Sequence, residues 1–254
     1  MTLQQLQYIS DAEAEVINNI DALKGLLGNV LYDEAQRFVN TVPRAAQLTD
    51  ASLPFDEQYY FLHRIETVRR IRLTARIDAL ALAKMIEEDY EAARLWSDYA
   101  TEELQHDRLY LADLRKHGYT VEEVLKTEPL DSTRELISFL EQELSRAGSI
   151  AAVAYSIVVE WNSARFSKPA VERAEREYGK NKVKGSKAHL AIDIDEDHYN
   201  MMVKIVHRLL QTSCNIPTLI RLITSICQLF RNYFEELHWL THDKPAVRTF
   251  VPLT

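Results

Sequence analysis

Glycine and proline are scarce in this sequence of 254 residues, with six and seven occurrences respectively. Both residues interrupt regular backbone structure, and proteins built from many short strands need them at their turns. Their scarcity therefore disfavours an all-β fold and favours long helices. Hydrophobic residues make up 46% of the chain, which is enough to bury a sizeable core. We expect an all-α fold, a bundle of seven to nine helices that forms a single domain over residues 1–254.

Cysteine is also scarce, and long apolar runs and an excess of positive charge are absent. The two cysteines, Cys214 and Cys227, form no metal-binding or redox pattern. Apolar stretches such as 150–159 are too short to span a bilayer, and residues 1–16 lack the basic and apolar parts of a signal peptide. The net charge of −8 disfavours nucleic acid as a partner, because phosphate neutralisation needs a basic surface. We therefore expect a cytoplasmic protein with no membrane span and no nucleic-acid partner.

Helical patterns extend over most of the chain. The first predicted helix ends near Gly28, and Pro169 is expected to kink or end the helix that contains it. Helices between about 55 and 210 form the predicted core, and residues 241–254 form an irregular tail. The predicted helices cover about residues 2–27, 30–42, 55–89, 90–117, 131–147, 150–178, 187–212 and 217–240.

The first candidate site residues are Glu103 and His106. They are three residues apart on a predicted helix, so they project from one face and can bind the same ion. Surface helices carry many glutamate and histidine pairs that are simply solvated, so this pattern alone does not identify a site.

The second candidate is Glu160, which follows an apolar stretch of a predicted helix. A helix that is apolar on all faces is usually buried. A buried carboxylate is costly unless a metal ion or a charged partner compensates it. An ion pair with Arg165 is the structural alternative to a metal ligand at this position.

The third candidates are Asp195 and His198, which repeat the carboxylate-x-x-His spacing on another predicted helix. The neighbours Asp193, Glu196 and Asp197 also fit a solvated charged face. Two such pairs with a buried glutamate between them nevertheless form a constellation, because helical proteins hold two irons with carboxylates and imidazoles that project into the bundle core. The combined pattern predicts a metal site.

These segments resemble those of a known family, the haem-oxygenase-like diiron oxidases, which are relatives in fold of the TenA and PqqC proteins. The string EELQHDRLYLADLRKHG at 102–118 resembles the E-E-x-x-H-D signature of the first core helix. Glu160 in VVEWNSAR matches the lone glutamate of the second core helix, and IDEDHY at 194–199 resembles the third. The resemblance covers residues 55–210, most of the chain.

The resemblance implies a haem-oxygenase-like bundle that binds Fe(II), two ions per chain, and uses O2. The implied reaction is the oxidation or oxidative cleavage of a small organic substrate, for example C–C cleavage or N-oxygenation. The ligands that we expect from the pattern and the resemblance together are Glu103, His106, Glu160, Asp195 and His198.

The sequence departs from the family pattern at two positions. Tyr99 stands where many members have a glutamate, so Glu103 must serve instead. Ala191 stands where the third core helix usually has a histidine, and the nearby His189 lies nine residues before His198, on the opposite side of a straight helix. We therefore expect the second iron to be weakly held, with His189 as a ligand only if that helix is irregular or bulged.

Three aromatic residues near the expected ligands, Tyr99, Tyr155 and Trp161, are candidates for the lining of a substrate pocket. Each would equally fit a plain hydrophobic core. The expected partners are a small-molecule substrate and O2. The sequence leaves open whether the protein forms a homodimer.

Two other interpretations remain open. A ferritin-like bundle would use Glu66 as an additional ligand, although Glu66 lies among Arg64, Arg69 and Arg70 and fits an ion pair better. Alternatively, a cofactor-independent protein of the TenA and PqqC type would use the same polar residues to bind an organic ligand.

Overall fold

The structure, a computed structural model, describes residues 11–242, without the side chains of residues 11–12 and 193–196. The described residues form helices and no strand, which confirms the predicted all-α fold. A π-helical turn, η1 (Ser163–Ser167), joins α7 to α8, and a 3-10 turn, η2 (Lys180–Val183), precedes α9. The α-helices are α1 (Asp11–Asn18), α2 (Ile20–Thr41), α3 (Glu57–Glu88), α4 (Tyr90–Lys116), α5 (Val121–Lys126), α6 (Asp131–Ala147), α7 (Ile150–Asn162), α8 (Lys168–Tyr178), α9 (Lys184–Glu196), α10 (His198–Thr212) and α11 (Ile216–Thr241).

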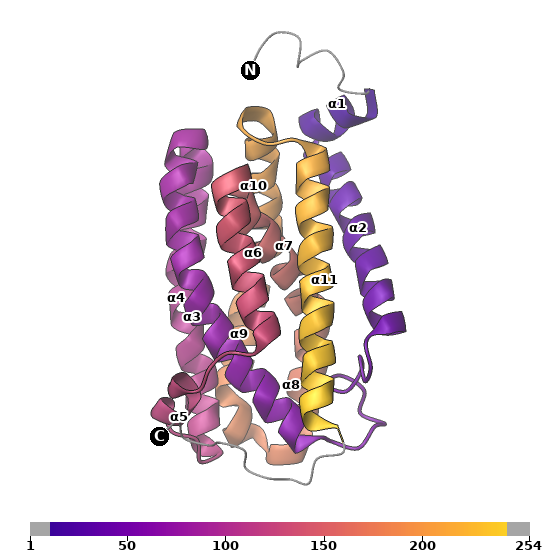
Figure 1. The fold of residues 1–254 in the computed structure, drawn as a ribbon, viewed down its shortest axis with the longest axis vertical. Coiled ribbons are helices and arrows are strands. Elements are labelled where there is room, and N and C mark those ends of the chain that lie inside the picture. Colours follow the sequence, from indigo (N-terminus) through magenta and orange to yellow (C-terminus); the bar gives the residue numbers. More distant parts are fainter. Residues whose placement is uncertain (1–10, 243–254) are drawn as a thin grey trace.

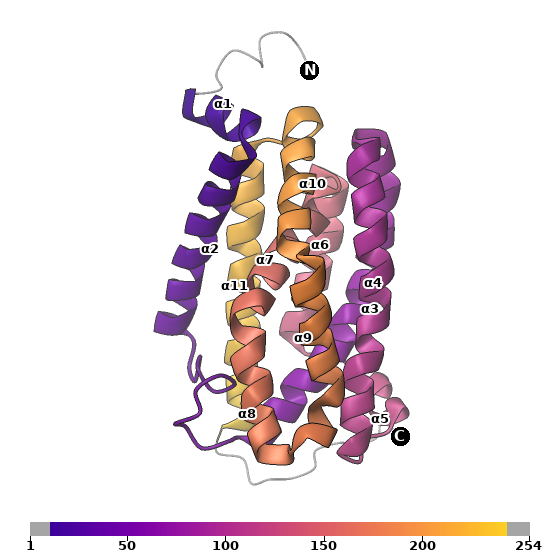
Figure 2. The ribbon, with the colours of Figure 1, turned by 180° about the vertical axis from the view of Figure 1, so that it is seen from behind.

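The long helices stand side by side along the long axis of the molecule (Figure 1). Helices α3 and α4 pack against each other at one edge, and α2 lies with α11 at the opposite side (Figures 1 and 2). Helix α7 lies between these groups and packs against α3, α6, α10 and α11. The bundle therefore encloses α7.

Helix α7 forms the centre of the hydrophobic core. All of its side chains from Ile150 to Val158 are buried, as expected for a helix that is apolar on every face. The small side chains of Ala151, Ala152 and Ala154 allow the neighbouring helices to approach closely. Glu160, two residues before the end of α7, is consequently buried in the interior.

The helix boundaries near the amino terminus differ from the prediction. Helix α2 continues through Gly28, so the predicted helix end at that residue is wrong. The break lies at Asn19, whose side-chain oxygen accepts hydrogen bonds from the backbone N–H groups of Asp21 and Ala22 at 2.9 and 3.3 Å. Further breaks of this kind divide the described residues into eleven α-helices, against the seven to nine expected.

Pro169 produces a π-helical turn. The predicted helix 150–178 runs from α7 into α8 through η1, which ends two residues before the proline. Proline cannot donate a backbone hydrogen bond, and its ring crowds the carbonyl of the preceding turn. The wider π turn relieves this crowding while the chain continues as a helix.

The predicted helix 187–212 is broken at Asp197, which has a left-handed backbone conformation with φ of 48°. This residue ends α9 and precedes α10, so Asp195 and His198 do not share one regular helix. The side chain of Asp195 lies outside the described residues, and its predicted role as a ligand stays a prediction.

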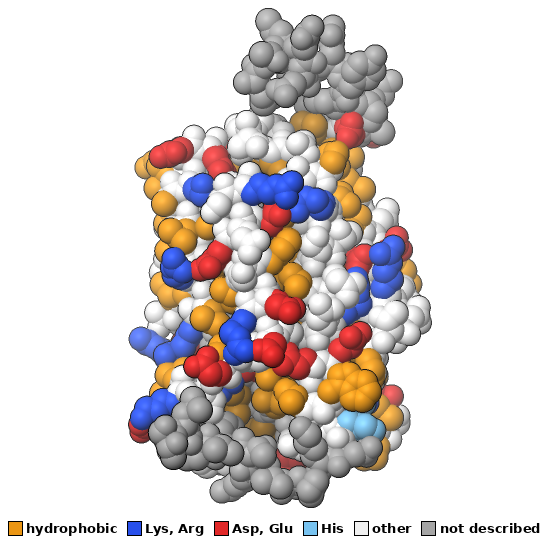
Figure 3. Space-filling model, in the orientation of Figure 1, with side chains coloured by type: hydrophobic (Ala, Val, Ile, Leu, Met, Phe, Trp, Pro, Cys, Tyr) orange, Lys and Arg blue, Asp and Glu red, His pale blue; other side chains and the backbone are white. Residues whose placement is uncertain are grey.

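The surface carries charged side chains of both signs among hydrophobic ones (Figure 3). Across residues 11–242, the helices include none with the length and apolarity needed to cross a bilayer. The predicted irregular tail lies mostly outside the described residues, since α11 continues to Thr241. The part of the first predicted helix before residue 11 also lies outside them.

Candidate metal centre

Three of the predicted site residues converge in the interior of the bundle. Glu103 on α4, Glu160 on α7 and His198 on α10 each offer a ligand atom, and these three atoms all lie within 4.8 Å of one another. Glu160 is 5% exposed and His198 is 1% exposed. Their helices pack against a common centre, because α10 contacts both α4 and α7.

The break at Asp197 places His198 at the first position of α10. The left-handed conformation changes the direction of the chain between α9 and α10. The imidazole of His198 can therefore reach Glu160 without following the face of α9. The backbone break at Asp197 thus helps to bring His198 to Glu103 and Glu160. The sequence pattern predicted the same grouping but placed His198 on a continuous helix.

Hydrogen bonds hold these groups in place. The Nε2 atom of His198 donates to Glu102 Oε2 at 2.8 Å, and its Nδ1 atom lies 3.7 Å from Glu160 Oε2. The hydroxyl of Tyr99 donates to Glu160 Oε1 at 2.9 Å. Both carboxylate oxygens of Glu160 therefore have a defined neighbour.

The carboxylates dominate the electrostatics of the site. Burial alone would lower the pKa of His198, but Glu160 and Glu102 overcome this and raise it to about 9. Burial and the charge of Glu160 hold the pKa of Tyr99 well above its ordinary value, so its hydroxyl stays a hydrogen-bond donor. The carboxylates therefore favour a positive charge between them, and the protonated imidazole of His198 supplies it.

A second group of residues adjoins the first through Glu103. The buried His106 places Nδ1 3.0 Å from Glu103 Oε1. The ring of His189 on α9 lies beside His106, with ring centroids 4.3 Å apart, and also contacts Tyr110 at 5.1 Å. His189 thus lies near the predicted ligands although a straight helix would direct it away, because the helix is broken before His198.

Two acidic residues near the centre were missed by the sequence reasoning. Asp78 on α3 is buried, and its burial together with the charge of Glu103 raises its pKa to about 8. An isolated aspartate in the otherwise apolar segment 77–83 was the available signal. Glu102 stands next to Glu103 in the sequence, and its bond to His198 depends on tertiary packing that no local pattern shows.

Comparison with protein families identifies one match. The family described as iron-containing redox enzyme matches residues 54–231, more than half of the chain. The chain belongs to the iron-containing redox enzyme family. A search of curated proteins found no match.

Solved structures share the fold. A haem-oxygenase-like domain from Shewanella denitrificans has a TM-score of 0.70 at 18% identity, over 89% of this chain and 98% of that one. A TenA homologue from Pseudomonas syringae has a TM-score of 0.69 at 18% identity, over 85% of this chain and 92% of that one. A TenA homologue from P. horikoshii has a TM-score of 0.62 at 16% identity, over 86% of this chain and 98% of that one. These likenesses confirm the predicted haem-oxygenase-like fold.

The residues of this family member fit the metal that the family's description implies. Two carboxylates and one imidazole, from Glu103, Glu160 and His198, supply oxygen and nitrogen donors of the kind that Fe(II) accepts. A ligating imidazole in metalloproteins commonly donates its other ring N–H to a carboxylate. Glu102 accepts such a bond from His198 Nε2, which leaves Nδ1 on the side of Glu160.

Glu66, the additional ligand that a ferritin-like bundle would use, has structural partners instead. Glu66 is fully buried, pairs with Arg69, and accepts hydrogen bonds from Leu130 N and Thr133 Oγ1 at 3.1 and 2.7 Å. These contacts agree with an ion-paired glutamate and give no support to a ferritin-like site in this family member.

The three aromatic candidates are all buried. Tyr99 contacts the centre directly through Glu160. The ring of Trp161 is covered by the Arg165 guanidinium at 3.9 Å, while Arg165 also donates to the Trp161 backbone carbonyl at 3.1 Å. Tyr155 stacks on Phe230 with ring centroids 6.1 Å apart.

Proposed function

We propose that this protein is a non-haem iron oxidase that uses O2 to oxidise or oxidatively cleave a small organic substrate. The observation that carries the proposal is the convergence of Glu103, Glu160 and His198 within a buried part of the bundle. Membership of the iron-containing redox enzyme family supports it independently.

In this proposal Glu103, Glu160 and His198 hold the first Fe(II). A second ion would take His106 and His189, share Glu103, and gain Asp195 as a further ligand. We propose that the second ion is held more weakly, because Ala191 supplies no donor where related proteins have an imidazole. Bound Fe(II) would supply the one-electron chemistry that allows O2 to react with an organic molecule.

The residues around the ligands prepare the site. Tyr99 fixes one oxygen of Glu160, and Glu102 fixes the orientation of the His198 ring. Buried side chains keep bulk water away from these groups. Asp78 holds a proton beside Glu103 at neutral pH, since its pKa is raised to about 8.

Anaerobic titration with Fe(II), followed by iron analysis and O2 uptake, tests the proposal. The wild type should bind iron, and His198→Ala should lose most of it while its helical circular-dichroism signal is retained. His207→Ala is the matched control, because it removes a histidine from the same helix at a distance from the site. Failure of the wild type to bind Fe(II) would refute the proposal.

A cofactor-independent enzyme or ligand-binding protein on the same fold is the second candidate. The likeness to TenA homologues and the hydrogen bonds that already engage Glu160 and His198 favour it. This candidate predicts that removal of metal leaves the activity unchanged, whereas the iron oxidase would lose it.

A further inference from the structure

The candidate metal centre is in ring contact with a tyrosine. The ring centroids of His106 and His189 lie 4.3 Å apart, and those of His189 and Tyr110 lie 5.1 Å apart. Rings at such distances are in van der Waals contact. His106 and His189 are proposed to hold the second ion, so an oxidisable phenol directly adjoins a ligand of the candidate centre.

The guanidinium of Arg64 joins this tyrosine to a second one. Its central carbon lies 5.1 Å from the ring centroid of Tyr110 and 5.3 Å from that of Tyr60. The ring of Tyr60 in turn contacts that of Tyr178, with centroids 5.7 Å apart. Tyr110, Tyr60 and Tyr178, from α4, α3 and α8, therefore form a series that leads away from the metal centre. We call these three residues the tyrosine series.

Tyr178 is the end of the tyrosine series that solvent reaches. Tyr110 and Tyr60 are buried, whereas Tyr178 is half-buried. The hydroxyl of Tyr178 donates a hydrogen bond to Oε1 of the exposed Glu57 at 3.3 Å. A phenol that loses an electron becomes a strong acid, and a carboxylate at its oxygen is placed to take the proton. Tyr178 thus combines access to solvent with a proton acceptor.

The aromatic contacts on the other side of the centre end in the core. Tyr99 contacts His198 and Trp96, with ring centroids 5.3 Å apart in each pair. Trp96 is fully buried, and its Nε1 donates to the backbone carbonyl of Asp78 at 3.0 Å. Trp96 therefore gives no route to solvent, in contrast to Tyr178.

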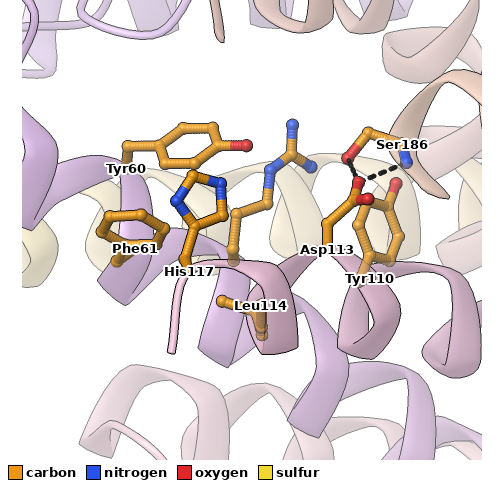
Figure 4. A pocket seen from close by; sticks show the side chains of 8 residues that line it. Tyr60, Phe61, Tyr110, Asp113, Leu114, His117 and Ser186 are labelled. Carbon is orange, nitrogen blue, oxygen red and sulfur yellow. Dashed lines mark hydrogen bonds between the residues drawn. The ribbon is translucent and has the colours of Figure 1, made fainter. Parts of the chain in front are cut away.

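A small cavity adjoins both buried members of the tyrosine series. It is lined by Tyr60 and Tyr110 together with Arg64, Asp113 and His117 (Figure 4). Its volume of about 10 Å³ is about the room that one water molecule needs. The Nε atom of Arg64 and the Nε2 atom of His117 have no hydrogen-bond partner among the described residues. The cavity thus offers a water polar neighbours, and such a water can pass the proton of either phenol to Asp113.

The charge of Arg64 couples electron loss from these rings to proton loss. Burial alone would lower the pKa of Arg64, but its contacts with Tyr60, Tyr110 and Asp113 overcome this and raise it, so the guanidinium stays charged. A tyrosine that lost only an electron would place a second positive charge beside this cation, which is unfavourable in a buried site. Loss of the proton at the same time leaves the ring neutral.

We propose that Tyr110, Tyr60 and Tyr178 carry oxidising equivalents from the metal centre to the protein surface when O2 reacts there without a substrate. The inference rests on the proposed function, because iron and O2 supply the oxidising equivalent. The tyrosine series then protects the protein during reactions that oxidise no substrate.

Each transfer moves one electron and one proton. Tyr110 gives an electron to the oxidised centre and its proton to Asp113. Tyr60 restores Tyr110 in the same way, and Asp113 again holds one proton. An electron from Tyr178 and the proton from Asp113 then restore Tyr60, while the proton of Tyr178 passes to Glu57. A one-electron reductant in solution, such as ascorbate, returns an electron to Tyr178, and Glu57 returns the proton.

Met202 reports oxidising equivalents that do not leave the centre. It follows His198 by four residues on α10, so the two side chains lie on the same face of that helix. Met202 is fully buried, which shields it from oxidants in bulk solution. Oxidation converts its thioether to a sulfoxide, which mass spectrometry detects.

Anaerobic loading with Fe(II), followed by mixing with O2 in the absence of substrate, tests the proposal. The wild type should give a tyrosyl radical signal in freeze-quench electron paramagnetic resonance, and a spin trap should label Tyr178. Tyr110→Phe keeps the ring but removes the oxidisable hydroxyl, so it should lose most of the label at Tyr178 and accumulate more Met202 sulfoxide. Tyr90→Phe is the matched control, because Tyr90 is an exposed tyrosine of the same helix.

Tyr60→Phe interrupts the tyrosine series at a second point and should give the same losses, so a folding defect in one variant would not hide the result. The proposal is overturned if the wild type forms no tyrosyl radical, if Tyr110→Phe labels Tyr178 as the wild type does, or if Tyr90→Phe gives an equal loss.

Iron uptake is measured first on every variant and should equal that of the wild type. A lack of iron uptake by the wild type would refute the proposed function together with this inference. Normal iron uptake without radical transfer to Tyr178 would refute only the inference.

Discussion

His198 lies between two carboxylates, and this arrangement determines how it titrates. Glu102 and Glu160 raise its pKa from 6.5 to about 9 in spite of its burial. Because the folded-state pKa lies above the ordinary value, the charged contact stabilises the fold fully below about pH 6.5. This contribution is lost as the pH rises through 9.

We therefore predict that His198 of the metal-free protein titrates near pH 9 in an NMR experiment. Glu160→Gln removes the anion that contributes most to this stabilisation of the imidazolium, so the same variant should titrate at a lower pH. A His198 resonance that titrates near pH 6.5 in the wild type would contradict the described contacts.

Asp78 gives a prediction with the same sign of pH dependence, in a lower pH range. Its pKa is raised from 3.8 to about 8, so the folded state retains a proton that the unfolded chain releases above about pH 4. The wild type should lose stability between pH 4 and pH 8 through this residue, whereas Asp78→Asn should not. Urea denaturation across this range should show the variant gaining stability relative to the wild type up to about pH 8. A difference that does not change with pH would argue against a buried, protonated Asp78.

At the scale of the secondary-structure elements, the break between α9 and α10 determines where His198 points. Asp197 adopts the left-handed conformation that glycine tolerates without strain and that β-branched residues avoid. Asp197→Gly should therefore keep the break and the iron uptake.

Asp197→Val should lower the free energy of unfolding by about 1–2 kcal/mol and reduce Fe(II) binding, because α9 and α10 would tend to form one continuous helix. Chemical denaturation and anaerobic iron titration of the two variants measure both effects. Wild-type iron binding by Asp197→Val would show that the break does not position His198.

The contact between α4 and α9 brings His189 to His106. Gly185 makes this contact possible, because a Cβ atom at this position would lie 1.9 Å from the Leu109 carbonyl oxygen. Gly185→Ala should push α9 away from α4 and separate the two imidazoles. In the proposed function this change should weaken the second iron and leave the first in place.

Iron titration of Gly185→Ala measures this effect. Gly25→Ala is the control, since nothing lies within 4 Å of its added Cβ atom. Full uptake of two irons by Gly185→Ala would show that the packing of α9 does not control the second position, and loss of all iron would show that the two positions are not separable.

For the molecule as a whole, composition and periodicity were sufficient to predict the helical architecture. The scarcity of glycine and proline predicted long helices, and the apolar faces of α7 predicted its burial together with that of Glu160. The spacing of chemical groups predicted that Glu103, Glu160 and His198 belong together, and the structure brings them within 4.8 Å. The single-domain organisation over residues 1–254 stays a prediction.

The remaining features depend on packing between distant parts of the chain. Glu102 and Asp78 reach the centre because α10 and α3 pack against α4. Asp78 is marked in the sequence by its apolar neighbours, but neither residue's partner at the centre is visible from its own helix. The position of His189 depends on a backbone break at Asp197, an aspartate that fits equally well in a solvated helix. A pattern within one helix cannot show such contacts, because they arise from tertiary structure.

The central claim is that iron occupies the space between Glu103, Glu160 and His198. X-ray diffraction from crystals grown anaerobically with Fe(II), with data collected on both sides of the iron absorption edge, tests it most directly. The account predicts an anomalous difference peak that is in contact with these three side chains, and a weaker peak or none between His106 and His189. Iron bound only elsewhere, or no anomalous peak among Glu103, Glu160 and His198, would contradict the account.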